Sequence, residues 1–262
     1  MKLNDQIWKH IIDFCKIDLN NINESNMICT ITSQQIKDSR NSWTGKSNQF
    51  EPRLLCKFDT KNSRPKIFKD NNIYMISIKN GIYALIKTDI YIKLVIDEVC
   101  NPKIIRNTTN SLLLDIGNSE ISMLDKLKYN NILTEIIGEE IKYGPLLGGR
   151  HYCSFNTFIG TQEIEINGSQ YETDGCYETD NFACIVEAKS KKHENFNIRQ
   201  LYYPFREVHK KIGDKKQIIC LFIHKEYKKK EKKDIIHIHK FKWNNYEKML
   251  DIKNIKYYKY IL

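Results

Sequence analysis

The sequence predicts an α+β or α/β protein, with a helix-rich N-terminal domain at 1–112 and a mixed β-sheet flanked by helices at 113–262. Two observations lead to this prediction. Apolar residues recur at helical spacing near the N-terminus, whereas farther along the chain they alternate as in strands with one buried face. In the second half, strands and helices then follow one another in the order of a sheet covered by helices.

Three short helices are predicted at the beginning of the chain. Apolar residues at helical spacing indicate a helix at 4–18. Thr32 or Ser33 can cap a second helix that runs to about Arg40, because their hydroxyl groups accept hydrogen bonds from free helical N–H groups. The segment 50–58 is predicted to form the third helix.

A β-hairpin follows these helices. Two alternating strands at 73–78 and 82–86 flank Asn80-Gly81, the dipeptide preferred in tight hairpin turns. Three helices followed by a two-stranded ribbon is the order of a winged-helix module, in which the second or third helix enters the DNA major groove. The basic residues expected to meet phosphate are Arg40, Lys46, Arg53, Arg64 and Lys66. A small helical domain with a hairpin and solvated lysines explains the same pattern.

The second half is predicted to combine helices with antiparallel strands. A composition shift near 107–117 marks the expected domain boundary. The predicted elements are helices at 119–129, 132–141 and 198–209, strands at 152–159, 163–166, 171–174, 217–224 and 235–241, and turns or loops at 145–150, 167–168 and 225–233. His237 and His239 share one strand face and are expected to point to solvent.

The candidate site lies on two of these strands. Asp174 ends one strand, and Glu187 and Lys189 point to the same side of the next, while Ala188 points to the other side. If the two strands are neighbours, Asp174 lies beside the pair. Two carboxylates can bind a divalent cation, and a lysine beside them is suited to hydrolysis of phosphodiesters.

Composition limits the function classes. The net charge of +10 favours a polyanionic partner, although the abundance of Lys, Asn and Ile also indicates the coding bias of an AT-rich genome. The eight cysteines are scattered, with no CxxC motif. No signal peptide is recognised, and no apolar run approaches the roughly 18 residues of a membrane span. We therefore expect a soluble cytoplasmic protein of a prokaryote or virus, with no membrane partner.

These motifs resemble those of the PD-(D/E)xK nuclease superfamily, and more closely its type II restriction endonucleases with an N-terminal DNA-reading module. The matching segments cover most of the chain: EPRLLCKFDTKNSRPKIF, IYMISIKNGIYALIK, GNSEISMLDK, YETDG, IVEAK and FNIRQLYYPFR. One departure is that Thr173, and not a proline, precedes Asp174.

The resemblance implies a role for each site residue. Asp174, Glu187 and the Ala188 carbonyl would hold Mg²⁺, and Lys189 would orient the attacking water. Glu120 or Glu172 would supply a further acid, and Gln200 would act from the following helix. Further basic residues expected at DNA are Arg150, Arg199 and Arg206.

The function implied is Mg²⁺-dependent, sequence-specific cleavage of double-stranded DNA that leaves 5′-phosphates. A palindromic target implies a homodimer, and a partner DNA methyltransferase is expected in a restriction-modification system. Two alternatives stay open: a DNA-binding regulator with a degenerate nuclease fold, and a structure-selective repair nuclease.

Overall fold

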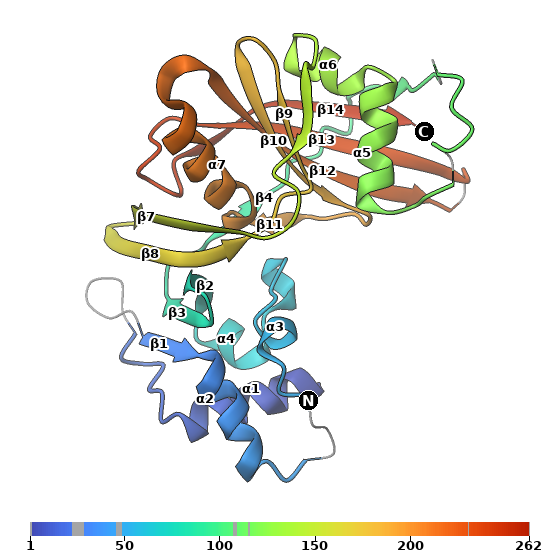
Figure 1. The fold of residues 1–262 in the computed structure, drawn as a ribbon. Helices are drawn as coiled ribbons and strands as arrows, with labels where there is room; N and C mark the ends of the chain where they lie inside the picture. The colour runs from blue at the N-terminus through green and yellow to red at the C-terminus, as the bar shows by residue number, and fades with distance from the viewer. Residues whose placement is uncertain are drawn as a thin grey trace.

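The computed structural model describes residues 2–22, 29–45, 49–106, 109–114, 116–229 and 231–261. Its elements form an N-terminal group and a larger C-terminal group (Figure 1). The N-terminal group contains α1 (Leu3–Phe14), β1 (Cys29–Thr32), α2 (Ser33–Ser39), η1 (Arg40–Ser42), α3 (Pro52–Leu55), η2 (Lys61–Ser63), α4 (Lys66–Asp70), β2 (Tyr74–Lys79) and β3 (Ile82–Ile86).

The C-terminal group begins with two short strands and then builds the main sheet. Its helices are α5 (Glu120–Tyr129), α6 (Ile132–Ile137), α7 (Arg199–Ile212) and η3 (Gly213–Lys215). Its strands are β4 (Tyr91–Lys93), β5 (Lys103–Ile104), β6 (Tyr143–Leu146), β7 (His151–Ile159), β8 (Gln162–Tyr171), β9 (Gly175–Glu178), β10 (Phe182–Lys189), β11 (Asn195–Asn197), β12 (Gln217–Lys228), β13 (Lys233–Trp243) and β14 (Ile252–Ile261).

The N-terminal helices agree in part with their prediction. Thr32 caps α2 through a capping box, in which Gln35 reciprocates, so this prediction is confirmed. The third helix is shorter than predicted, because α3 covers only Pro52–Leu55 and ends at Cys56. The helix α4 was not predicted.

The predicted hairpin is confirmed. Strands β2 and β3 pair antiparallel, and Gly81 between them has a φ of +74°, which a side chain would strain. Strand β1 adds to the free edge of β3, giving the order β1-β3-β2.

A seven-stranded mixed sheet forms the centre of the C-terminal group, in the order β5-β14-β13-β12-β10-β9-β6. Strand β10 pairs antiparallel with β9 and parallel with β12, and α7 makes the crossover between the two parallel strands. Figure 1 shows α7 on one side of the sheet and α5 on the other. The coarse prediction of a mixed sheet flanked by helices is therefore confirmed.

Both faces of β10 are buried, as predicted. Ile185 packs in the hydrophobic cluster that includes Leu201 of α7. Cys184 and Val186 pack in a second cluster with Leu124 of α5. A strand with helices over both faces has no solvated side, so the polar side chains at its end occupy an unusual position.

The structure corrects the turn predicted at Asn167-Gly168. Strand β8 runs through it, and the ribbon of β7 and β8 instead turns at 160–161. Gly168 is the extra residue of a β-bulge, because Cys153 pairs with Ser169 and the next residue pairs with Asn167. Its φ is +69°, a value that glycine adopts in bulges as well as in turns. The sequence alone therefore does not distinguish a bulge here from a turn.

The loop predicted at 225–233 is shorter than predicted. Strands β12 and β13 form a long hairpin in which Lys225 pairs with Ile236 and Lys228 pairs with Lys233. Lys225, Lys228 and Lys233 therefore lie on strands, whereas Lys229 and Lys232 lie in the turn. The last strand, β14, was not predicted.

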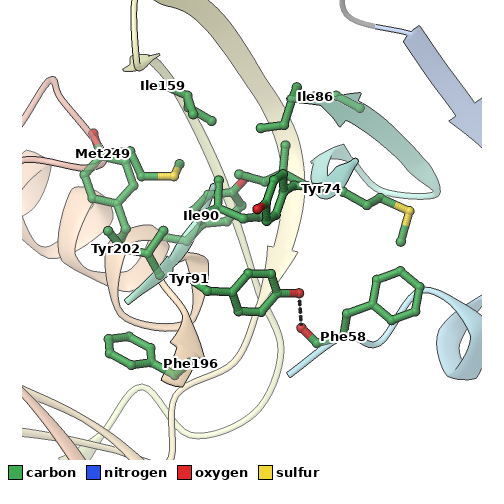
Figure 2. Packing of buried hydrophobic residues seen from close by; sticks show 14 of the residues in the cluster. Phe58, Tyr74, Ile86, Ile90, Tyr91, Ile159, Phe196, Tyr202 and Met249 are labelled. Atoms are coloured by element: carbon green, nitrogen blue, oxygen red, sulfur yellow. Dashed lines mark hydrogen bonds between the residues drawn. The ribbon is translucent and has the colours of Figure 1, made fainter. Parts of the chain in front are cut away.

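The two groups are in direct contact. The hairpin β2–β3 lies against β8, where the Asn80 N–H donates to the Gly168 carbonyl at 3.0 Å and the Ser77 and Ser169 hydroxyls are 2.8 Å apart. One hydrophobic cluster continues across the contact (Figure 2), and within it the Tyr91 hydroxyl donates to the Phe58 carbonyl at 2.8 Å.

The domain boundary at residue 112 stays a prediction. Strand β4 already pairs with β11, and β5 pairs with β14, so residues before 112 complete sheets of the C-terminal group. Across the described residues, no helix is long and apolar enough to cross a membrane.

Candidate active site

Strand pairing brings Asp174 beside Glu187. Gly175 at the start of β9 pairs with Val186 of β10, so the preceding Asp174 lies level with the next residue of β10. Its Oδ2 atom accepts the Ala188 N–H at 2.7 Å. This hydrogen bond fixes the carboxylate at the point where β9 and β10 separate.

Glu187 is 7% exposed although it carries a carboxylate. Its Oε1 atom accepts hydrogen bonds from the Lys189 ammonium and from Gln200 Nε2 at 2.7 Å. Burial raises the pKa of Glu187 to about 7, and the charge of Asp174 adds to this effect while Lys189 opposes it. The environment therefore disfavours the anion unless a cation is close by.

The other two members of the trio respond to the same charges. Burial raises the pKa of Asp174, although the Ala188 N–H and Lys189 act against it. Burial alone would lower the pKa of Lys189, but Glu187 and Asp174 outweigh it and raise the value. Lys189 is therefore a stable cation beside two carboxylates that repel each other.

Glu120 lies at the first position of α5, which Ser119 caps. Its Oε1 atom accepts the Ser190 N–H at 2.9 Å, so the helix terminus contacts the end of β10. Burial opposes ionisation, yet the hydrogen bonds from Ser190 and the charge of Lys189 lower the pKa of Glu120. Glu172 is exposed and forms an ion pair with Arg150 at 3.2 Å.

Sequence reasoning missed Asp59. Its charge acts on both Glu187 and Lys189, although it belongs to the N-terminal group. The segment around it is held against β11, because its carbonyl accepts the Asn197 N–H at 3.3 Å and the Lys61 N–H donates to Asn195 Oδ1 at 2.7 Å. No local motif marks this aspartate, because only the folded chain brings it here.

A cleft of about 490 Å³ contains Asp174, Glu187, Lys189 and Asp59, and both halves of the chain form its walls. Glu120 is not among the residues that line it. The C-terminal group contributes Arg150, Gln170, Tyr171, Glu172, Asp174, Glu187, Lys189, Arg199 and Gln200. The N-terminal group contributes Ser33, Arg53, Cys56, Lys57, Asp59, Ser77, Asn80, Gly81 and Tyr83.

The carboxylates and one carbonyl fit a hard divalent cation. The N–H and C=O groups of one strand residue point to the same edge, so the Ala188 carbonyl faces the side where its N–H meets Asp174. No group of three or more His, Cys, Asp or Glu side chains in the described ranges could hold a metal. An ion here would rely on Asp174, Glu187, the Ala188 carbonyl and water, which suits Mg²⁺.

The basic residues predicted at DNA divide into two sets. Arg53, Arg150 and Arg199 line the cleft. The others lie elsewhere: Arg40 beside a second depression, Lys66 in an ion pair with Asp70, and Arg206 over the Phe155 ring at 4.5 Å. Lys46 is outside the described residues.

Arg64 was expected to meet DNA phosphate, but the structure places it in the interior. It is 5% exposed, and its guanidinium donates to the carbonyls of Lys61 and Ile73 and lies 4.1 Å from the Tyr74 ring centroid. Its donors therefore stabilise the N-terminal group, and we leave it out of the candidate DNA surface.

The expectation of solvent-facing histidines was wrong. His237 and His239 are 1% and 0% exposed, because on their face of the sheet the rings pack beside His224 of β12 and Tyr257 of β14. His239 Nε2 lies 3.3 Å from His224 Nε2, and His237 contacts Glu226 at 3.1 Å and the Tyr257 hydroxyl at 2.7 Å. The His193 N–H donates to His224 Nδ1, so His224 links His193 to His239, while His237 stacks on His224 with the ring centroids 4.7 Å apart.

Comparisons with known proteins identify two family models along the chain. Residues 5–85 match a domain of unknown function, DUF6996, and residues 86–261 match another, DUF6997. No curated protein and no solved structure shows significant similarity to the chain.

Proposed function

The chain belongs to the DUF6997 family, a domain of unknown function, and from the geometry of the cleft we propose that it is a Mg²⁺-dependent nuclease that cuts DNA. The observation that carries the proposal is the convergence of Asp174, Glu187 and Lys189 at the end of β10. In the proposed PD-(D/E)xK fold, α5, β9, β10, α7 and β12 form the common core, and their order and pairing support it.

The chemistry follows from what each group can do. Mg²⁺ at the carboxylates would polarise the scissile phosphate and lower the pKa of a bound water. Lys189 orients that water and offsets the charge that builds on the phosphate oxygens. In the hydrolysis, a water oxygen would bond to phosphorus and give up a proton to solvent, while the bond to the 3′ oxygen breaks and that oxygen takes up a proton from solvent. The products are a 3′-hydroxyl and a 5′-phosphate.

Gln200 and Glu120 act as positioning residues in this proposal. Gln200 donates to Glu187 Oε1. This hydrogen bond holds the Glu187 side chain in one orientation, so the direction of its second carboxylate oxygen is also fixed. The Oε1 atom of Gln200 is buried and has no hydrogen-bond partner among the described residues, so a water molecule bound in the cleft would satisfy it. Glu120 fixes the backbone that follows Lys189 through Ser190.

We infer that double-stranded DNA is the substrate and that the target is a specific sequence, as in type II restriction endonucleases. Arg53 and Arg150 provide cations on opposite walls of the cleft, which suits a polyanionic backbone. A homodimer would cut both strands of a palindromic site, and a methyltransferase partner would protect host DNA. The N-terminal group, proposed to be winged-helix-like, would read bases.

One observation favours a second candidate, a DNA-binding regulator without cleavage activity. Glu187 forms a buried ion pair with Lys189, and a pair with a purely structural role would have the same arrangement. Cleavage separates the two functions directly.

The test is digestion of a sequenced plasmid with the full chain and Mg²⁺, followed by run-off mapping of the ends. We expect discrete fragments with 5′-phosphates, and no cleavage when a chelator removes the metal. Asp174→Asn and Lys189→Ala should each reduce the cleavage rate by about 10³-fold while keeping DNA binding.

Asp180→Asn is a matched control, because Asp180 forms an exposed ion pair with Lys142 outside the cleft. It should cut at the wild-type rate. Full cleavage by Lys189→Ala would contradict the site assignment, and DNA binding by the wild type without cleavage would favour the regulator.

A further inference from the structure

The lining of the cleft combines two chemically different sets of side chains, which we call its charged end and its neutral end. The charged end holds the carboxylates and Lys189, and Asp59 of the N-terminal group acts on Glu187 and Lys189. The neutral end consists of N-terminal side chains that can donate or accept hydrogen bonds: Ser33, Cys56, Asn80 and Tyr83. Arg53 and Lys57 of the same group also line the cleft. The opposite wall adds the Gln170 amide.

The neutral end is a fixed surface. The Ser33 N–H donates to the Gly81 carbonyl at 2.7 Å, which ties the start of α2 to the hairpin turn. A Cβ at Gly81 would meet the Ser33 hydroxyl at 3.3 Å, so the contact is close. Tyr83 interacts through its hydroxyl with the side chains of Ser33 and Cys56, and burial raises the pKa of Tyr83 to about 12. Its hydroxyl is therefore uncharged and held in place.

Arg199 lies between the two ends. It lines the cleft, donates to the Gln170 carbonyl at 3.0 Å, and lies 5.3 Å from the Tyr203 ring centroid. Its charge also acts on the Tyr83 hydroxyl. A planar cation at this position suits a sugar-phosphate segment that connects the two ends.

Size and chemistry together select the ligand. A cleft of about 490 Å³ matches pockets that take small molecules. A paired base cannot enter such a cleft, because it lies inside a duplex whose major groove alone is roughly 12 Å wide. Phosphate would prefer the cations of the cleft, such as Lys189 and Arg199. Hydroxyl and amide groups recognise the hydrogen-bonding edge of a base.

We propose that the neutral end of the cleft binds one unstacked nucleobase next to the scissile phosphate, with Tyr83 and Ser33 contacting its edge. The inference rests on the proposed nuclease function and adds that the substrate is bound with one nucleotide rotated out of the base stack. Enzymes that act on single bases use the same displacement.

The experiment uses duplexes from the DNA region that the protein binds most tightly, with 2-aminopurine at successive positions. The fluorescence of this base rises when it leaves the stack. The full chain is added with Ca²⁺ in place of Mg²⁺, so that the duplex stays intact. We expect a several-fold rise at one position. A mismatch at that position should tighten binding by about tenfold, because unpairing is then easier.

Variants connect this signal to the cleft. Ser33→Ala combined with Tyr83→Phe should reduce the rise at least several-fold while the protein still binds DNA. Tyr152→Phe is the control, because Tyr152 is 56% exposed on β7 and does not line the cleft; it should leave the signal unchanged. Lys189→Ala should keep the signal and lose cleavage.

The outcomes separate the two proposals. Specific cleavage without a fluorescence rise at any position would overturn the base pocket and leave the nuclease intact. A rise that persists in the double variant would also overturn it, because another surface would then hold the base. Absence of cleavage of any DNA by the wild type, with a fluorescence rise, would reject the nuclease and keep the pocket. Absence of both would reject both.

Discussion

At the scale of single residues, the trio owes its properties to burial at the end of a strand. Glu187 continues the face of Ile185 into the protein and stays 7% exposed, so its charge depends on neighbours. Asp174 approaches from the link before β9 and adds repulsion. Two carboxylates and one lysine leave a negative excess, which a bound cation would neutralise.

Asp59 increases this negative excess from the N-terminal group. We expect Asp59→Asn to raise the Mg²⁺ concentration needed for half-maximal cleavage about thirtyfold, because removing one charge near the site weakens attraction by about 1 kcal/mol per cation charge, which is about 2 kcal/mol for Mg²⁺. Titration of the cleavage rate with Mg²⁺ measures it.

Asp70→Asn controls for loss of an acid in the same half of the chain, because Asp70 pairs with Lys66 on α4. It should leave the Mg²⁺ requirement unchanged. An identical shift in both variants would mean that Asp59 has no special relation to the site.

The parts of this site that could be predicted from the sequence are those whose position depends on the local pattern of residues. Alternation placed Glu187 and Lys189 on one side of a strand, and the structure brings Asp174 beside them. Asp59 and the burial of Arg64 were not predictable, because both depend on how the two groups pack. An arginine that donates to the Lys61 and Ile73 carbonyls has the same local sequence as a solvated one.

At the scale of elements, strands were predicted less well than helices. The cap at Thr32 fixes the start of α2 from a few residues, whereas β4, β5 and β11 pair with partners far away in sequence. Gly168 was misread because a bulge and a turn both use a residue with positive φ. The lysine run forms strand at both ends because the pairing of β12 with β13 continues to Lys228 and Lys233, which the local sequence does not reveal.

The histidines of β12 and β13 make this hairpin sensitive to acid. Burial lowers the pKa of His224 to about 2 and that of His239 to about 4, with further lowering by neighbouring histidines. In the unfolded chain these histidines have an ordinary pKa near 6.5 and bind protons below that pH, whereas in the folded hairpin they do not. Their contribution to folding stability is therefore fully present above pH 6.5 and is lost as the pH falls toward 4. We expect the free energy of unfolding to decrease by about 1.4 kcal/mol per histidine per pH unit in this range.

Urea unfolding at a series of pH values tests this expectation. Glu187 acts in the opposite direction, because its pKa of about 7 in the folded state makes proton uptake stabilising as pH falls. Because Glu187 is present in both the wild type and His239→Gln, its contribution cancels when the two proteins are compared. In the variant, the free energy of unfolding should decrease less steeply as the pH falls. Equal slopes in the two proteins would contradict the assignment.

At the scale of the whole molecule, the two groups form one structural unit. Phe58 and Tyr74 of the N-terminal group share a hydrophobic cluster with Tyr91 and Phe196 (Figure 2). The family models meet between residues 85 and 86, yet this cluster extends across that position. Separating the halves would expose its apolar side chains to water.

We therefore expect a single cooperative unfolding transition, with the calorimetric enthalpy equal to the van't Hoff enthalpy. Phe58→Ala and Phe196→Ala should each lower that same transition, with a loss of about 3–5 kcal/mol. Two separate transitions, of which each variant lowers only one, would show that the groups unfold independently.

Helix α7 relates the position of the N-terminal hairpin to the chemistry. Gln200 at its start donates to Glu187 at 2.7 Å, and one turn later the Tyr203 hydroxyl donates to the Ser77 carbonyl of β2 at 2.5 Å. A shift of the hairpin on contact with DNA would move the helix that orients Glu187. For a nuclease built in this way, a wrong base pair would lower kcat as well as weaken binding, so sequence discrimination would continue after the complex has formed.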